Sequence, residues 1–267
     1  MSDARPDPAV GEAQRDRGAG VDWRLYLVTD PHLGGGRDAV PGIAYEAVLG
    51  GVGVVQVRDK EGDDDEFAIH AVAVAEAVAR ACTETGRVVP VFVNDRADVA
   101  RELGLHLHVG QRDIPFARAR SAMPDHLMVG LSIESDAQLG AALAGPGPVP
   151  DVIGVSPVWA TATKTDTAAA LGPEGADRLA RAAHAHRSGG GGVREADGGV
   201  GGAAGGVRAV GIGGVTPATV ARLAATELDG ICVVSAIMAA PDPRAAAAEL
   251  IARWEAGKSL PPKGEPA

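Results

Sequence analysis

"VFVNDRADVA", residues 91–100, passes from the chemistry of a strand to that of a helix within one short stretch. Its first three residues are β-branched or aromatic, which favours a strand, whereas "ADVARELG" (97–104) has the composition of a helix. Asn94 and Asp95 fall between the two. Both residue types are common in turns and as helix N-caps, so Asp95 or Asp98 could simply start the helix. A further role for them depends on the rest of the chain.

The same alternation of short apolar runs and alanine-rich helical stretches recurs along the chain. Eight runs are predicted as strands: 25–29, 53–58, 88–94, 105–109, 127–132, 152–156, 207–212 and 230–235. The clearest helical patterns are at 65–84, 135–144, 217–227 and 242–257, and prolines 115 and 217 stand where a first helical turn would begin.

Strands that alternate with helices imply right-handed crossovers and a parallel sheet. Eight such units predict an α/β fold, a closed (β/α)8 TIM barrel, as a single domain over residues 22–256. An open doubly wound sheet is the alternative, but it would need fewer strands or an antiparallel edge.

Three segments do not follow this alternation. Residues 1–21 and 257–267 are rich in Pro and Gly and are predicted to be disordered tails. Residues 188–206, about half glycine, are predicted to form a flexible insertion before the seventh strand, on the face of the barrel away from the chemistry. The alternative is a glycine-rich phosphate loop, but such a loop needs a defined strand-to-helix turn.

Composition narrows the class of protein. The formal net charge is −10 and the pI is near 5.1, with no dense run of Lys or Arg, so binding to nucleic acid is not expected. Cys82 and Cys232 lie in apolar runs, which indicates buried thiols in a reducing compartment. No apolar core of a secretory signal is present, and no apolar stretch approaches the roughly 18 residues of a membrane span. A cytoplasmic protein without a membrane partner is predicted, and a homo-oligomer is compatible with the sequence.

The ends of the predicted strands carry polar side chains, and barrels of this kind draw their catalytic groups from these ends. The second strand ends in Gln56, Arg58 and Lys60, which strand alternation directs to one face, with Val57 and Asp59 opposite. An amide and two cations on one face predict an anion site.

Two carboxylates, Asp95 and Asp113, are expected on neighbouring strand ends. They would repel each other unless a cation joined them, and oxygen ligands suit Mg²⁺, which usually keeps waters and substrate phosphates beside a few carboxylates. We therefore expect a diphosphate to be held here by Mg²⁺ and the two cations of the second strand. His106 and His108 share a strand face without a third metal-like neighbour, and are expected to be buried histidines rather than ligands.

A second anion site is predicted on the opposite side of the barrel mouth, which is the end where the carboxyl ends of the strands open to solvent. "GIGGVTP" (211–217) offers backbone N–H groups of a glycine turn ahead of a helix expected near Pro217, and the eighth strand adds Val234 and Ser235. Barrels often bind a phosphate after strands seven and eight in this way. One phosphate site and one Mg-diphosphate site imply two phosphorylated substrates, and hence transfer.

Seven motifs in order carry a resemblance to a known family. "QVRDK", "VND", "GQRD", "GLS", "PVWATATKTD", "GIGG" and "VVSAI" closely resemble thiamine-phosphate synthases over roughly residues 24–255. The family joins 4-amino-2-methyl-5-(diphosphomethyl)pyrimidine to a (carboxy)thiazole phosphate, giving thiamine phosphate and diphosphate. The resemblance therefore implies a transferase of an alkyl (pyrimidinylmethyl) group that uses Mg²⁺ as cofactor.

The resemblance also assigns residues. It implies that Asp95 and Asp113 hold Mg²⁺, and that Arg58, Lys60, Ser132 and Lys164 form the catalytic set. Residues implied to bind substrate are Gln56, Val57, Arg58, Asp59, Lys60, Asn94 and Ser132 for the pyrimidine diphosphate, and Thr161, Ala162, Thr163, Lys164, Gly214, Val234 and Ser235 for the thiazole phosphate and released diphosphate. Trp159, Ala160 and Asp59 depart from the usual family pattern, but they spare the ionic groups.

The expected chemistry is departure of diphosphate followed by attack of the thiazole nitrogen. No cysteine and no Ser–His pair is expected at a strand end, so catalysis would come from charge placed on the leaving group. A non-catalytic or tautomerase-like barrel that binds only a thiazole phosphate is the main alternative. Such a barrel would not need the diphosphate clamp, which is the set of Arg58, Lys60, Asp95 and Asp113. An isomerase or indole-forming synthase would need an acid–base pair instead of metal-bound carboxylates.

Overall fold

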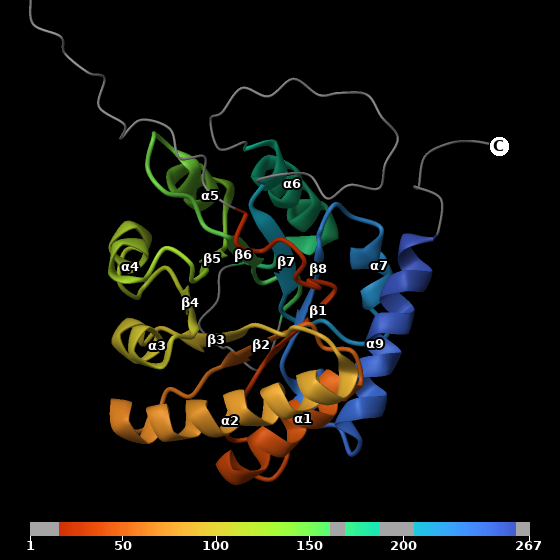
Figure 1. Cartoon of the computed structure of the whole chain (residues 1–267). Helices are drawn as coiled ribbons and strands as arrows, with labels where there is room; N and C mark the ends of the chain where they lie inside the picture. Colours follow the sequence, from red (N-terminus) through yellow and green to blue (C-terminus); the bar gives the residue numbers. More distant parts are fainter. Residues whose placement is uncertain (1–15, 161–168, 187–205, 260–267) are drawn as a thin grey trace, which may run out of the picture.

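The computed structural model describes residues 16–160, 169–186 and 206–259. In these residues eight parallel strands close into a barrel in sequence order (Figure 1). The strands are β1 (Leu25–Val28), β2 (Val54–Val57), β3 (Val91–Asn94), β4 (His106–Val109), β5 (Val129–Ile133), β6 (Val152–Val155), β7 (Arg208–Ile212) and β8 (Gly230–Val233). The (β/α)8 barrel predicted from the alternating pattern is confirmed, and the open sheet is excluded because β1 pairs with β8.

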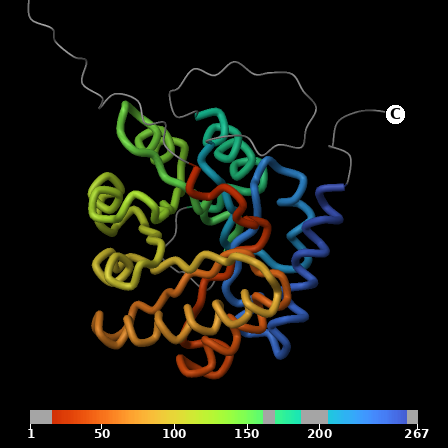
Figure 2. Tube along the Cα trace, in the orientation of Figure 1, coloured from red at the N-terminus to blue at the C-terminus, as the bar shows by residue number. Residues whose placement is uncertain are grey.

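Helices follow the strands and surround the barrel. They are α1 (Val40–Leu49), which a 3-10 turn η1 (Arg37–Ala39) precedes, α2 (Asp64–Thr85), α3 (Ala97–Leu103), α4 (Phe116–Ala122), α5 (Asp136–Leu143), α6 (Gly172–Ala185), α7 (Val220–Ala224), α8 (Ser235–Met238) and α9 (Pro243–Lys258). Side-chain caps start three of the predicted helices: Asp63 accepts from the amide of Glu66 at α2, Ser135 from that of Gln138 at α5, and Asp242 from that of Ala245 at α9. Around the barrel, α1 packs between α2 and α9, and α9 also contacts α7 (Figures 1 and 2).

Most elements are slightly shorter than predicted, and the two largest differences each have a local reason. The third strand begins at Val91 instead of 88, because Pro90 lacks the N–H that a ladder requires. The helix predicted over 217–227 is only α7, because Thr219 accepts a hydrogen bond from the Thr216 amide and holds the preceding residues in a turn.

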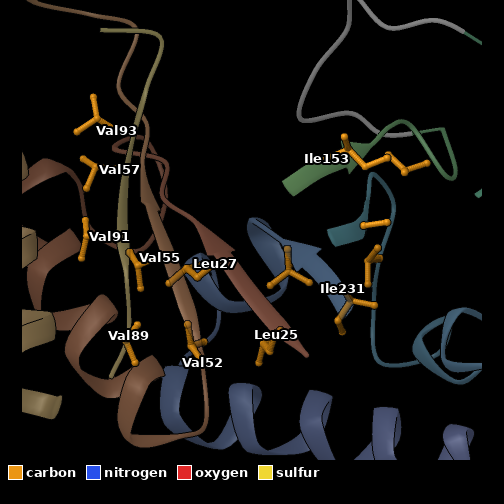
Figure 3. Close-up of a cluster of buried hydrophobic side chains, with 14 of the residues drawn as sticks. Leu25, Leu27, Val52, Val55, Val57, Val89, Val91, Val93, Ile153 and Ile231 are labelled. Atoms are coloured by element: carbon orange, nitrogen blue, oxygen red, sulfur yellow. The ribbon is translucent and has the colours of Figure 1, made fainter. Parts of the chain in front are cut away.

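Strand alternation divides the core into two layers. Leu25, Leu27, Val55 and Val57 face outward and pack under the helices (Figure 3). Tyr26, Val54 and Phe92 face inward and fill the barrel, with the Tyr26 and Phe92 rings 5.8 Å apart. This interior is a packed core without a pore, so chemistry is restricted to the ends of the barrel.

The amino end of the barrel is closed by Trp23, whose ring lies 6.4 Å from that of Phe92. Most of the predicted amino-terminal tail lies outside the described residues, but residues 16–21 form a turn beside this ring. Arg17 of this turn pairs with Asp151 at 3.0 Å. The predicted glycine-rich insertion falls, except for Gly206, outside the described residues. None of the helices in the described part of the chain is long and apolar enough to cross a membrane.

Candidate active site at the carboxyl end of the barrel

Asp95 and Asp113 meet at the carboxyl end of the barrel, and their carboxyl groups hydrogen-bond to each other. Asp95 directly follows β3, and its amide donates to the carbonyl of His108 on the next strand at 2.9 Å. It has a φ of 64°, the only positive φ outside glycine in the described residues. Aspartate tolerates this left-handed conformation better than most residues do, and it is a conformation typical of functional loops.

The helix-capping role for Asp95 is not observed. Helix α3 has Arg96 at its N-cap position and no side-chain cap hydrogen bond, while Asp98 in its first turn pairs with Arg101 at 2.8 Å. The carboxylate of Asp95 turns instead toward Asp113, whose Oδ2 accepts from the Gly110 amide at 2.7 Å.

Electrostatics gives the two carboxyl groups different pKa values. Burial, and then the hydrogen bond and charge of Asp113, raise the pKa of Asp95 to about 6. Burial also pushes the pKa of Asp113 upward, but the hydrogen bonds from Asp95 and from Gly110 outweigh it, so the pKa of Asp113 lies below its ordinary value. The pair thus holds one proton between two acids at mildly acidic pH. A hard cation that replaces this proton would relieve the repulsion of the fully ionised pair.

Lys60 brings a cation to the same place. Its Nζ lies 3.6 Å from Oδ2 of Asp95, and its side chain remains largely exposed, so it is available to a ligand in the mouth. Arg58, two residues earlier on the same face, is half-buried and its amide donates to the hydroxyl of Thr29. Lys60 thus lies beside Asp95, whereas a place for the Arg58 side chain beside the two aspartates stays a prediction.

Val57 and Asp59 occupy the opposite face, as alternation predicts, and this changes the roles expected for their side chains. Val57 is fully buried in the outer layer of the core. The carboxylate of Asp59 is buried against Arg37 from η1, whose Nε donates to its Oδ2 at 2.8 Å, and also accepts from the Glu61 amide at 2.9 Å. Both side chains were predicted to contact substrate, yet both are engaged by the protein itself, so only their backbone groups remain for a ligand.

Arg96 is a residue that sequence reasoning missed. Its guanidinium donates to the carbonyls of Glu61 and Gly62, pairs with Asp64, and lies over the Phe67 ring at 4.7 Å. It therefore ties the loop that carries Lys60 to the loop that carries Asp95. The only signal in the sequence is its place directly after the "VND" motif.

Three polar residues form the floor of the mouth inside the barrel. Gln56 is buried and donates to the hydroxyl of Tyr26 at 2.9 Å, and the side chain of Asn94 hydrogen-bonds to Asp95. Ser132 on β5 is half-buried, with its Oγ 3.1 Å from Nε2 of His108. The expectation that no Ser–His pair lies at a strand end is therefore wrong. The two residues are 24 positions apart in the chain and meet only because β4 and β5 are adjacent.

The predicted phosphate side lies at the ends of β7 and β8. Gly213 and Gly214 have φ of 101° and 66°, and Cβ atoms added to them would meet Pro157 at 3.0 Å and Trp159 at 2.7 Å. The glycine turn therefore packs closely on the loop after β6. Val234 stands at the N-cap of the four-residue helix α8, and exposed Ser235 is the first residue of this helix.

Four predicted site residues cannot be placed. Thr161, Ala162, Thr163 and Lys164 lie outside the described residues. Within the described ranges no group of three or more His, Cys, Asp or Glu side chains could hold a metal ion. The two aspartates therefore suit a metal that takes its remaining ligands from water and substrate, which is how Mg²⁺ is usually bound.

Comparison with known proteins tests the resemblance inferred from the motifs. The family model described as thiamine monophosphate synthase matches residues 25–237. The chain belongs to this family. The strand-end motifs therefore identified the family correctly.

Individual relatives differ in length. The thiamine biosynthesis multifunctional protein ThiED of Corynebacterium efficiens is 46% identical over 244 residues, and its counterpart in Corynebacterium glutamicum is 46% identical over 234 residues. These matches cover 90% and 86% of this chain but only 30% and 27% of the relatives, so the chain spans less than a third of their length. The thiamine-phosphate synthase of Laribacter hongkongensis is 36% identical over 233 residues, which cover 87% of this chain and 95% of that protein.

Solved structures agree with the barrel. The thiamine phosphate pyrophosphorylase of Pyrococcus furiosus superimposes with a TM-score of 0.67 at 25% identity, covering 89% of this chain and 98% of that one. A ribulose-1,5-bisphosphate carboxylase/oxygenase of Pyrococcus horikoshii, at 18% identity and a TM-score of 0.57 over 91% of this chain and 59% of that one, shares the fold alone.

Proposed function

We propose that this chain is a thiamine-phosphate synthase. It would join 4-amino-2-methyl-5-(diphosphomethyl)pyrimidine to a thiazole phosphate or carboxythiazole phosphate, and release diphosphate. The observation that carries the proposal is the meeting of Asp95, Asp113 and Lys60 at the carboxyl end of the barrel. Membership in the thiamine monophosphate synthase family supports it.

The diphosphate is proposed to bind over the two aspartates. Lys60 and Arg58 contribute positive charge on one side of this position, and Asn94 and Ser132 contribute neutral polar groups from the floor. The side chain of Gln56 is buried and donates to the hydroxyl of Tyr26, so its amide is oriented to hydrogen-bond with a ring atom of the pyrimidine. Arg37 and Arg96 hold the loop that presents these cations.

Asp95 and Asp113 are proposed to hold Mg²⁺. Two half-buried carboxylates that share a proton are a suitable donor set, because a divalent cation would replace the proton and remove the repulsion. When bound, Mg²⁺ supplies positive charge to the oxygens of the diphosphate. The chain's own contribution is to keep the two carboxylates adjacent, with a pKa of about 6 for Asp95 that still leaves it mostly ionised at neutral pH.

The thiazole phosphate is proposed to bind across the mouth. Gly214, Val234 and Ser235 are proposed to offer it their backbone N–H groups. Thr161, Ala162, Thr163 and Lys164, which lie outside the described residues, complete the proposal on this side, with Lys164 directed to the diphosphate.

Catalysis is proposed to rest on charge. As the bond between the methylene carbon and the diphosphate oxygen breaks, Lys60 and Arg58 stabilise the negative charge that the leaving group gains, and the thiazole nitrogen then attacks the carbon. A cytoplasmic location, and no nucleic-acid or membrane partner, remain part of the proposal.

One assay tests this function. Purified chain is mixed with both phosphorylated heterocycles, with and without Mg²⁺, and diphosphate and thiamine phosphate are measured. We expect both products only when the two substrates and Mg²⁺ are present. Diphosphate release with the pyrimidine alone would indicate hydrolysis, and no product under any condition would favour the alternative of a non-catalytic or tautomerase-like barrel that binds a thiazole phosphate.

A further inference from the structure

His108 lies beneath the mouth and is not among the residues expected to bind substrate. It is buried on the inner face of β4, and its Nε2 lies 3.1 Å from Oγ of Ser132. Its other ring nitrogen, Nδ1, is buried and has no hydrogen-bond partner among the described residues. A neutral imidazole ring carries a single proton, on one nitrogen or the other.

The surroundings of Nδ1 decide which nitrogen carries that proton. A Cβ atom added to Gly130 on β5 would lie only 2.4 Å from Nδ1, so this nitrogen faces the Cα of the glycine at close range. An N–H at Nδ1 would point at a C–H group and find no acceptor, whereas a lone pair there can receive a weak Cα–H contact. The proton therefore belongs on Nε2, and the Nε2–H donates to the Ser132 oxygen.

The same geometry argues against a nucleophilic serine. In a Ser–His pair that activates the serine, Nε2 must be a free base and Nδ1 must donate its proton to an orienting acceptor. Within the part of the chain that the structure describes, no such acceptor faces Nδ1 of His108. The hydroxyl of Ser132 is therefore not deprotonated by this histidine.

We propose that His108 is a positioning residue that turns Ser132 into a directed hydrogen-bond donor. Because the Ser132 oxygen accepts from His108, its single O–H proton is left for the mouth, where it meets an acceptor atom of the pyrimidine diphosphate. Without His108 the hydroxyl could rotate and accept as readily as donate. This inference rests on the proposed function, but the tautomer of His108 does not.

Two amides of different reach test the proposal kinetically. In His108→Gln the side-chain amide can place an N–H near the position of Nε2, whereas in His108→Asn it stops near Nδ1. We expect Ser132→Ala and His108→Asn each to lower kcat/KM for the pyrimidine diphosphate about tenfold, the effect of one hydrogen bond, and His108→Gln to stay within about threefold of wild type. Ser132→Ala/His108→Asn should lose no more than Ser132→Ala alone, because both changes remove the same interaction.

Additive losses in the double variant, or a His108→Gln as poor as His108→Asn, would overturn the proposal, because a merely structural histidine produces these results. Thermal unfolding of each variant separates loss of fold from loss of positioning. If the variants at 108 do not fold, Gly130→Ala takes their place, since its Cβ must displace the ring. Gly154→Ala is the matched control, because its Cβ would only touch the same ring at 3.5 Å.

The tautomer can be measured without any activity. A ¹⁵N–¹H spectrum of the histidine rings in the whole chain at neutral pH should show the His108 proton on Nε2, assigned by its loss in His108→Gln. A proton on Nδ1 would reject the proposal even if the enzyme is active. If wild type makes no thiamine phosphate, the proposed function fails, while the spectrum still decides the direction of the hydrogen bond.

Discussion

The aspartates at the two ends of the barrel have different partners. At the amino end, Asp151 precedes β6 and pairs with Arg17 at 3.0 Å and Arg120 at 3.7 Å, while its second oxygen also accepts from the Val129 amide. At the carboxyl end, Asp95 follows β3, and its carboxylate has a second acid for a partner and one lysine at 3.6 Å.

The contrast in pKa holds for a second aspartate of the amino end, Asp229, whereas burial raises the pKa of Asp151 as it raises that of Asp95. Asp229, just before β8, hydrogen-bonds to His184 and to the Ala209 amide. Burial pushes its pKa upward, but these hydrogen bonds outweigh it and leave the pKa below the ordinary value, whereas the pKa of Asp95 rises to about 6. The ionic groups of the amino end thus pair with each other and stabilise the fold. The carboxyl end keeps two adjacent acids, Asp95 and Asp113, that a ligand could bind. The comparison makes four predictions, from the largest expected effect to the smallest.

Asp151→Ala should reduce the free energy of unfolding by about 3 kcal/mol, because it leaves the buried guanidinium of Arg120 and the half-buried one of Arg17 without their carboxylate. Chemical denaturation measures this loss. Turnover per folded molecule should remain unchanged, since the site lies at the other end of the barrel. A lower turnover of fully folded Asp151→Ala protein would show that the amino end also affects catalysis.

Lys60→Ala should lower kcat about a hundredfold, near 3 kcal/mol of barrier, because it removes positive charge from the leaving diphosphate. Its unfolding free energy should change little, since the side chain is largely exposed. Lys258→Ala is the control, because Lys258 donates to the carbonyl of Thr226 at the amino end of the barrel. Near-wild-type turnover of Lys60→Ala would contradict the clamp.

Asp95→Asn should stabilise the Mg²⁺-free protein at neutral pH by roughly 1 kcal/mol, after allowance for solvent screening. The folded pKa of Asp95 is raised, so its stabilising contribution is complete below about pH 4 and is lost as the pH rises through about 6. The gain from Asn should therefore be absent near pH 4 and reach a plateau above pH 6. Unfolding curves across this range measure it, and a gain that shrinks with rising pH would refute the assignment. Added Mg²⁺ should protect the wild type more than the variant.

Arg96→Ala should raise KM for the pyrimidine diphosphate several-fold with a smaller change in kcat, because the loop bearing Lys60 loses its tie to the loop bearing Asp95. Arg101→Ala, one turn away, removes only an exposed pair with Asp98 and should change stability by less than about 0.5 kcal/mol. Equal effects of the two variants on KM would contradict the inference that Arg96 positions the loop bearing Lys60.

Much of the fold could be predicted because it depends on short-range pattern. The alternating apolar runs predicted the strands, and the number of these runs predicted the barrel. The predicted boundaries differed from the observed ones only through local effects, such as the missing N–H of Pro90 and the hydrogen bond to Thr219. The side-chain faces of the second strand were also predicted, since alternation alone places Val57 away from Gln56.

The site was only partly predictable because it depends on pairs far apart in the chain. The sequence could not show that the carboxylate of Asp59 would accept a hydrogen bond from Arg37, which stands 22 positions earlier. Nor could it show that His108 would lie under Ser132. One signal was available, the glycine inside "LMVGLS", since a glycine in the middle of a strand often marks a close approach by another group. That group is the ring of His108.

The order of residues alone determined which chemical groups stand at the ends of the strands, because period-two and helical patterns are properties of neighbouring positions. Closure of the sheet decided which of those groups meet: acid with acid at Asp95 and Asp113, acid with cation at Asp151, and imidazole with hydroxyl at Ser132. The physical reason is that charge and hydrogen bonding act over a few ångströms in space, and only the register of adjacent strands brings those positions within reach.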